Sequence, residues 1–208
     1  NIKLNMAIKT ILTEPNKILR QISKPVEKVG DDERLLMNDM LDTMYAANGI
    51  GLAAIQIGIP KRIIVMDLSK KDEKKQPRYF VNPVIKNINE KLVTYEEGCL
   101  SVPGQFAEID RPSICEVEYL DYYGKKQFLR ATGILATCIQ HEIDHCNGLL
   151  FIDYLSKLKK SMIIKKLSNN IFKDWKQVKG RLVFLKRIKK QCFKTLQMKY
   201  SLILQLLA

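Results

Sequence analysis

The sequence has few of the features that hold small secreted proteins or membrane proteins together. Its five cysteines are an odd number and form no Cys-x-x-Cys pair, so neither a disulfide framework nor a zinc finger is indicated. No apolar run approaches the length of a membrane span, and no charged-then-apolar signal pattern begins the chain. We therefore expect a cytoplasmic protein without a membrane partner, whose 208 residues are enough to fold without cross-links.

Acidic residues are almost absent from the last quarter of the chain. Residues 1–156 hold 20 Lys and Arg against 21 Asp and Glu, a balance of −1, whereas residues 157–208 hold 15 against 1, a balance of +14. The net charge of +13 therefore describes the C-terminal segment rather than the whole protein. We expect a folded domain over residues 1–170, followed by a poorly ordered basic extension over residues 171–208.

Histidine is scarce, and its placement is informative. The chain has only two, His141 and His145, in a His-Glu-x-x-His pattern within a stretch predicted to be helical. Residues four apart share one face of a helix, so both imidazoles can bind a single ion. Glu142 lies beside the first histidine, where it can take a proton from a water that the ion activates. The alternative is an amphipathic helix with two surface histidines, but both fall on the spacing that makes a metal site.

A catalytic ion of this kind needs a third protein ligand and one open position. Cys99, in the Glu-Gly-Cys-Leu-Ser run of residues 97–101, is the best candidate, and Cys138 is its rival on spacing. The remaining cysteines have weaker claims, because buried cysteine usually behaves as a small hydrophobic residue. A thiolate and two imidazoles suit Fe(II), Zn(II), Ni(II) or Co(II), and the residues alone do not choose among these ions.

Hydrophobic periodicity and turn residues predict the elements around these motifs. A core-facing helix should run from residue 31 or 32 to about 48, a helix carrying the two histidines from about 132 to 147, and a helix with a basic face from 157 to 167. Strands are predicted at residues 62–68, 79–81, 84–88, 92–95, 114–120 and 126–130, with turns at Asn82-Pro83 and Asn89-Glu90. The small residues of segment 49–56 permit either close backbone approach to a ligand or a tight turn into a strand.

Three segments together resemble the bacterial-type peptide deformylases. They are Gly-Ile-Gly-Leu-Ala-Ala-Ile-Gln at residues 49–56, Glu-Gly-Cys-Leu-Ser at 97–101 and Gln-His-Glu-Ile-Asp-His at 140–145. The resemblance implies an α+β fold in which small antiparallel sheets surround a central metal-binding helix. The implied reaction is metal-dependent hydrolysis of the N-formyl group from the N-terminal formyl-methionine of new polypeptides, with release of formate.

The resemblance also assigns roles to single residues. It makes Cys99 the third metal ligand beside the two histidines, Glu142 the general acid and base, and Fe(II) the implied ion. The Gln56 side chain and the Leu100 backbone N–H would bind the formyl oxygen, and Arg111 would position Glu97. Thr137 is more polar than the aliphatic residue usual in the family. The residues expected to border the substrate pocket are Ile50, Gly51, Tyr95, Glu97, Ile134, Thr137 and Cys138.

The expected partners are N-formylmethionyl nascent peptides, acted on by a monomer. The basic extension resembles nothing in the family; it either contacts ribosomal RNA or is an unstructured extension that arose from a shifted reading frame or a degraded stop codon. A metalloprotease with the same His-Glu-x-x-His helix is the alternative function, and a non-catalytic RNA-associated protein is a third. Cys99 favours the deformylase, because proteases with this helix usually take a third histidine or a glutamate as ligand.

Overall fold

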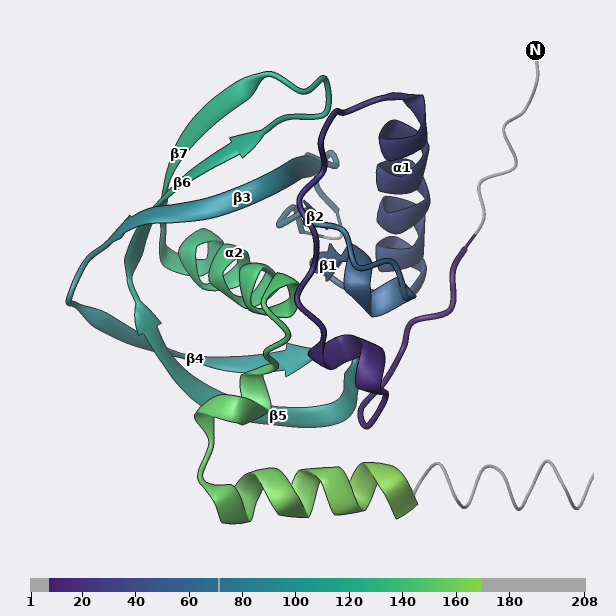
Figure 1. The fold of residues 1–208 in the computed structure, drawn as a ribbon. Helices are drawn as coiled ribbons and strands as arrows, with labels where there is room; N and C mark the ends of the chain where they lie inside the picture. The colour runs from purple at the N-terminus through teal and green to yellow at the C-terminus, as the bar shows by residue number, and fades with distance from the viewer. Residues whose placement is uncertain (1–7, 71, 170–208) are drawn as a thin grey trace, which may run out of the picture. The chain divides into compact units, whose positions relative to one another are not determined.

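A buried helix, α2 (Gly133–Cys146), lies between a five-stranded sheet and a two-stranded hairpin (Figure 1). The computed structural model describes residues 8–70 and 72–169; its contacts divide the chain into two units, residues 1–164 and 165–208. Of the second unit only residues 165–169 are described, and they are helical, as are residues 157–164. The basic extension predicted for residues 171–208 lies outside the described residues. No helix in the described part of the chain is long and apolar enough to cross a membrane.

The five-stranded sheet is antiparallel throughout, in the order β1-β2-β3-β6-β7. Its second strand β2, between β1 and β3, is buried on both faces, because Ile63 and Val65 pack in the cluster of α1 while Ile64 and Met66 pack in the cluster of α2. This double burial explains why β2 reads as a continuous apolar run. The bounds are β1 (Gly51–Ala53), β2 (Ile63–Met66), β3 (Arg78–Ile88), β6 (Ile114–Leu120), β7 (Lys126–Thr132) and α1 (Asp31–Ala46).

Strand β3 corrects one prediction. The sequence predicts a turn at Asn82-Pro83 between two short strands, but a single strand runs through both residues. The register with β6 shifts between Val81 and Val84, and such an irregularity accommodates a proline that cannot donate to the ladder. Asn82 has a φ of 52°, and its side-chain amide exchanges two hydrogen bonds with the backbone of Val26, at 2.8 and 2.7 Å. The Asn82 side chain therefore pairs with backbone outside the sheet, and β3 continues through residues 82 and 83 without a turn.

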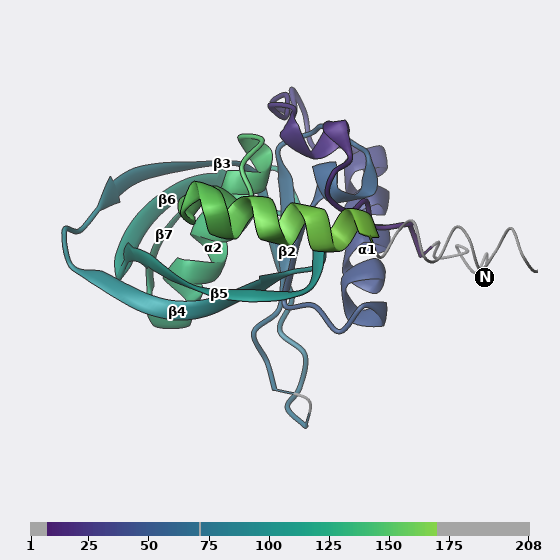
Figure 2. The same cartoon turned by 90° about the horizontal axis from the view of Figure 1, so that it is seen from below.

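The two-stranded hairpin consists of β4 (Leu92–Cys99) and β5 (Val102–Pro112), which run beside α2 in Figure 1 and lie together in the view of Figure 2. Sequence reasoning predicted only residues 92–95 of β4 and assigned no element to β5. Along the end of β5, Ile109 and Arg111 are buried whereas Glu108 and Asp110 are exposed. Buried and exposed residues therefore alternate along this part of β5. Because one of the buried residues is the charged Arg111, the sequence does not show the alternation of apolar and polar residues that predicts a strand.

The N-terminal segment is an extended arm, and its backbone hydrogen bonds connect it to two other parts of the chain. The backbone N–H of Leu12 donates to the carbonyl of Gln56 at 2.7 Å, and that of Glu14 donates to the carbonyl of Ser101 at 2.8 Å.

The helix end predicted at about residue 147 is confirmed, since α2 ends at Cys146. Beyond it Gly148 adopts a φ of 76°, and the carbonyl oxygen of Arg20 lies 2.6 Å from where a Cβ at this position would be. Three short 3-10 turns complete the described fold: η1 (Lys17–Arg20), η2 (Ala54–Ile57) and η3 (Phe151–Tyr154).

Candidate active site

Three side chains that could ligate a metal ion converge where the hairpin meets α2. His141 and His145 lie one turn apart on α2, and Cys99 is the last residue of β4. Their ligand atoms all lie within 4.8 Å of one another, with the Sγ of Cys99 3.2 Å from the Nε2 of His145. Ligands at roughly 2.0–2.3 Å from one ion stand ~3–4 Å apart, so this donor set fits a single borderline divalent ion. Within residues 8–70 and 72–169 no other such group occurs.

Cys138, the rival ligand, has a different place. It is buried on α2 in the cluster of apolar residues beneath the sheet, and its burial raises the pKa of its thiol well above the ordinary value. A thiol that holds its proton is a poor metal ligand, because the thiolate is the binding form. Cys99 therefore forms the group with the two histidines, and Cys138 lines the adjacent pocket.

His141 is oriented by a buried network of charges. Its Nδ1 lies 2.7 Å from Oε2 of Glu97, which leaves Nε2 free to face an ion. Glu97 in turn accepts two hydrogen bonds from Arg111, whose Nη1 also donates to Oδ2 of Asp144 at 2.8 Å. Burial opposes the ionisation of Glu97, yet the hydrogen bonds from His141 and Arg111 lower its pKa. The network holds one imidazole in a fixed orientation.

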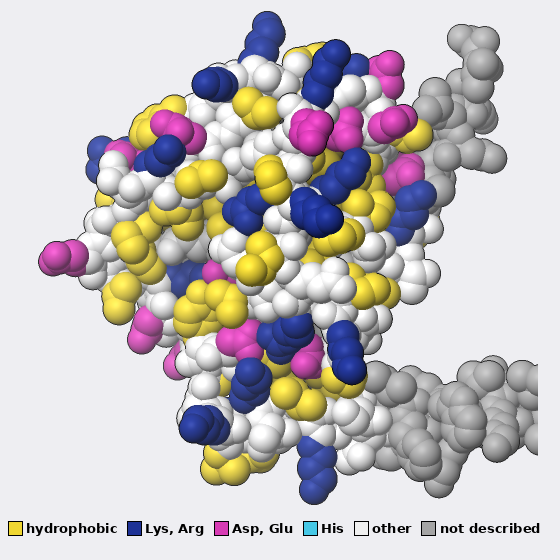
Figure 3. All heavy atoms as spheres, in the orientation of Figure 1, with side chains coloured by type: hydrophobic (Ala, Val, Ile, Leu, Met, Phe, Trp, Pro, Cys, Tyr) yellow, Lys and Arg dark blue, Asp and Glu magenta, His cyan; other side chains and the backbone are white. Residues whose placement is uncertain are grey.

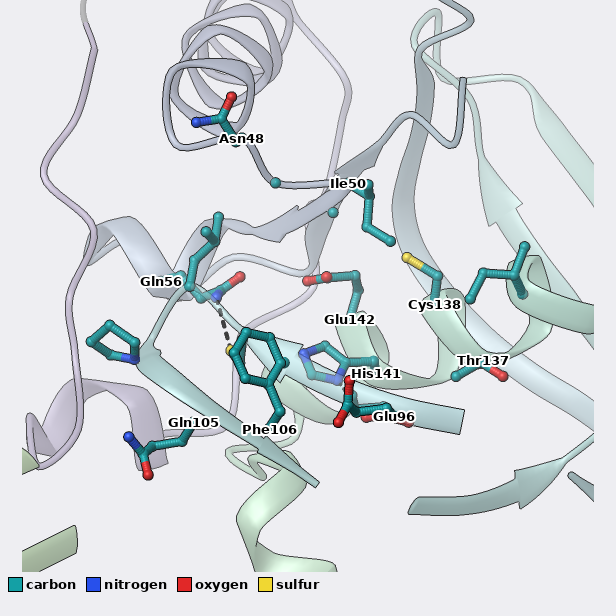
Figure 4. Close-up of a pocket in the computed structure, with 18 of the residues that line it drawn as sticks. Asn48, Ile50, Gln56, Glu96, Gln105, Phe106, Thr137, Cys138, His141 and Glu142 are labelled. Carbon is teal, nitrogen blue, oxygen red and sulfur yellow. Dashed lines mark hydrogen bonds and ion pairs between the residues drawn. The ribbon is translucent and has the colours of Figure 1, made fainter. Parts of the chain in front are cut away.

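His145 and Glu142 complete the inward face of α2. Burial lowers the pKa of His145 well below its ordinary value, so the ring is held in the neutral form that binds metals. Burial raises the pKa of Glu142 to about 7, and its Oε2 has no hydrogen-bond partner among the described residues. Figure 4 shows its carboxylate directed across the pocket toward Gln56. A buried carboxylate with a free oxygen and a pKa near neutrality suits proton transfer.

Gly51 provides the space that Glu142 occupies. A Cβ at position 51 would lie 2.3 Å from Oε1 and 2.9 Å from Cδ of Glu142, so any side chain there must displace the carboxylate. Of the two interpretations of segment 49–56, close backbone approach therefore describes Gly51, which lies in the edge strand β1. The approach is to a side chain of the protein itself.

We expect Gly51→Ala to lower kcat on the order of 10²-fold, because a displacement of about 1 Å at a reacting group is enough for a loss of that size. The fold should be kept, since the clash falls on the end of a side chain. Steady-state kinetics and thermal unfolding measure the two effects. Gly30→Ala is the matched control, because its nearest atom lies at 3.4 Å and belongs to the Glu33 side chain. Equal losses in both variants would contradict the assignment.

Gln56 lies across the pocket from Glu142 and contacts Cys99 of the metal-ligating group. It is 1% exposed, and its Oε1 accepts a hydrogen bond from the backbone N–H of Ala53 at 2.8 Å. Its Nε2 lies 3.1 Å from the Oγ of Ser101 and 3.6 Å from the Sγ of Cys99, the contact dashed in Figure 4. Leu100 lies between β4 and β5, next to Cys99, and lines the same pocket.

These groups form one wall of a pocket of about 480 Å³. Six of the seven residues predicted to border the substrate line it, and Tyr95 does not; its neighbour Glu96 takes part instead. Sequence reasoning missed the contribution of β5, whose Phe106 stands 65% exposed at the pocket. Phe106 could not be recognised from the sequence as a pocket residue, because the strand that carries it was not predicted. The other lining residues that were missed are Asn48, Gly49, Gly98, Pro103, Gly104 and Gln105.

Comparison with known proteins decides among the interpretations of this site. A family model described as polypeptide deformylase matches residues 8–161. The chain belongs to the polypeptide deformylase family. The peptide deformylase of Pelagibacter ubique is 78% identical over 163 residues, which cover 78% of this chain and 95% of that protein. The expected reaction, removal of the N-formyl group from nascent peptides, is thereby supported, and the metalloprotease alternative is not favoured.

Solved deformylase structures share the fold. The crystal structure of the Ehrlichia chaffeensis enzyme in complex with actinonin is 45% identical, with a TM-score of 0.76, and covers 79% of this chain and 98% of that chain. A Met-Ala-Ser-bound deformylase from Acinetobacter baumannii is 31% identical, with a TM-score of 0.68, covering 72% and 99%. The predicted α+β architecture, with antiparallel sheets around the helix that carries both histidines, is confirmed. Deformylases are metal-dependent hydrolases, and the Cys-His-His group matches that requirement.

Proposed function

We propose that this chain removes the formyl group from N-terminal formyl-methionine through the residues gathered around the 480 Å³ pocket. The observation that carries the proposal is the position of Glu142. Its carboxylate is buried with one free oxygen, one residue from His141, and faces the Gln56 amide across the pocket. A proton acceptor, a hydrogen-bond donor and a metal-ligating group therefore surround one space that a formyl group can enter.

Each of these residues has a chemical task. Cys99, His141 and His145 would hold the ion, which when bound would lower the pKa of a water and polarise a carbonyl group. Glu142 accepts the proton of the attacking water and returns it to the leaving amine, for which a pKa of about 7 is suited. The Nε2 of Gln56 and the N–H of Leu100 donate to the oxyanion, and such donors contribute ~3–4 kcal/mol each.

The pocket beside these groups accepts the methionine side chain. Its walls combine Ile50 and Ile134 with Cys138, whose Sγ points toward Ile50 in Figure 4. An unbranched thioether can adapt to an apolar space of this kind. The bound Met-Ala-Ser peptide of the Acinetobacter baumannii relative supports a substrate that begins with methionine. We include Gly51, Glu97 and Thr137 in the same wall.

We assign Fe(II) as the native ion. A donor set of one thiolate and two imidazoles accepts borderline divalent ions, and Zn(II), Ni(II) and Co(II) satisfy the same ligands. The resemblance to bacterial deformylases favours iron among them. We further propose that the chain acts as a monomer in N-terminal processing during protein biosynthesis. Its place of action would be the cytoplasm, where nascent peptides are made.

Formate release tests the proposed function. Purified protein loaded with Fe(II) or Ni(II) under exclusion of oxygen is expected to release formate from formyl-Met-Ala and to leave internal peptide bonds of a longer peptide intact. Formate is measured with a coupled dehydrogenase assay, and peptide products are measured by mass spectrometry. Cleavage of internal bonds without formate release would establish the metalloprotease instead.

The basic C-terminal segment is proposed to lie outside the catalytic domain of residues 1–170. The family match ends at residue 161, and on the face shown in Figure 3 acidic and basic side chains are interspersed, in keeping with the near-neutral charge of residues 1–156. The 10 Lys and Arg of residues 171–208 are suited to contact with phosphates, so we propose that this segment contacts the ribosome through RNA.

A chain truncated after residue 170 is expected to fold, hold its metal and deformylate a free peptide at the rate of the full chain. It should lose affinity for RNA, and the affinity of the full chain should fall with added salt because phosphate contacts release counterions. Formate release and a filter-binding titration at several salt concentrations measure these two properties. Precipitation or metal loss in the truncated chain would place the segment within the folded domain.

A further inference from the structure

The carboxamide of Gln56 is held in one orientation by contacts at both ends. Its Oε1 accepts from the N–H of Ala53, so the NH₂ group must face the opposite way, toward Cys99 and Ser101. Of the two acceptors there, the Oγ of Ser101 is the closer at 3.1 Å, while the Sγ of Cys99 is a weak acceptor at 3.6 Å. The serine hydroxyl therefore provides the stronger restraint on the NH₂ group.

Ser101 is itself fixed by its backbone. The residue is fully buried, its N–H lies 3.4 Å from the Sγ of Cys99, and its carbonyl accepts the hydrogen bond from Glu14. The arm that supplies Glu14 also supplies Leu12, whose N–H holds the carbonyl of Gln56. One extended segment thus clamps the backbones of both partners, and the hydroxyl of Ser101 has little freedom to leave Gln56.

We infer that Ser101 is a positioning residue that aims the Gln56 Nε2 at the formyl oxygen through the hydrogen bond between its Oγ and that nitrogen. The inference rests on the proposed function, because Gln56 matters only if it donates to a developing oxyanion. An amide NH₂ has two hydrogens, and Ser101 accepts one of them. The other hydrogen is thereby directed toward the Sγ of Cys99, 3.6 Å away, and so into the space beside the metal-ligating group.

Loss of the hydroxyl should act on the transition state and leave binding of the peptide unchanged. Without Ser101 Oγ, the NH₂ group keeps only the distant sulfur, and the carboxamide can rotate away from the productive direction. Preorganised donors are effective because they need no reorientation during the reaction. The cost should be a fraction of that for deleting the donor outright, which is ~10²–10³-fold in kcat.

The experiment compares Ser101→Ala with Ser23→Ala as a matched control. Ser23 is a buried serine whose Oγ has no hydrogen-bond partner among the described residues. We expect Ser101→Ala to lower kcat for formyl-Met-Ala on the order of 10-fold with KM and bound metal unchanged, whereas Ser23→Ala leaves kcat unchanged. Ser101→Thr, which keeps the hydroxyl, should restore most of the lost rate.

A double-mutant cycle with Gln56→Ala separates positioning from a general structural effect. In the Gln56→Ala background, Ser101→Ala should cause no further loss of kcat, because the group that the serine positions is absent. An equal loss in both backgrounds would overturn the inference, as would an unchanged kcat in Ser101→Ala or a loss of metal in that variant. Absence of formate release from the parent chain would instead overturn the proposed function.

Discussion

Replacing Glu142 by glutamine is expected to abolish nearly all turnover while the protein keeps its metal and its fold. The amide has the shape of the carboxylate but cannot accept the proton of the attacking water, and proton transfer of this kind contributes ~10²–10⁴-fold to a rate. Folding should not suffer, because the carboxylate is buried with its Oε2 unpartnered among the described residues. Formate release and metal analysis on the same preparation measure both outcomes.

The control for this variant is Glu108→Gln. Glu108 lies on β5 of the hairpin and is exposed to solvent, so the same chemical change there should leave kcat and metal content unaltered. If Glu142→Gln turned over substrate at a rate close to that of the parent, the proton would have another acceptor and the mechanism would be wrong. If the variant lost its metal, Glu142 would belong to the ligands.

Replacing Arg111 by methionine is expected to destabilise the protein by about 3–5 kcal/mol, because removal of one partner leaves buried charges uncompensated. Arg111 is 3% exposed and pairs with two carboxylates at once, those of Glu97 and Asp144. Methionine keeps much of the side-chain volume, so the loss reports charge rather than a cavity. Metal affinity should also fall, by ~10–100-fold, since Glu97 orients His141.

Urea unfolding and a competitive metal titration measure these two losses. Arg130→Met provides the control, because Arg130 is an exposed residue of β7 and its replacement should change the free energy of unfolding by no more than about 0.5 kcal/mol. A variant Arg111→Met as stable as the parent would show that Glu97 and Asp144 find other partners or take up protons without cost.

Much of the site could be predicted because its chemistry is local in sequence. Two histidines one helical turn apart, with a glutamate between them, define a face of a helix before any tertiary structure is known. The third ligand could not be derived in this way. Cys99 was the best candidate and Cys138 its rival on spacing; the structure brings Cys99, at the end of a strand, beside His145 and packs Cys138 among apolar side chains.

The fold was predictable where burial is one-sided or complete and unpredictable where function interrupts the pattern. Strand β2 and both main helices follow their apolar residues, and their positions were predicted to within two or three residues. Strand β5 was missed because one of its inward positions holds a charged residue, Arg111, which donates a hydrogen bond to Glu97. The turn predicted at Asn82-Pro83 failed because the Asn82 amide bonds to Val26, a partner 56 residues away.

The double burial of β2 makes the folding of the two layers interdependent. Ile63 and Val65 belong to the cluster that holds α1, and Ile64 and Met66 to the cluster that holds the histidine helix. A strand shared in this way cannot detach from one helix without exposing apolar surface that the other helix also covers. Local opening on the α1 side should therefore propagate to the metal-ligating side, so that these layers melt as one cooperative unit.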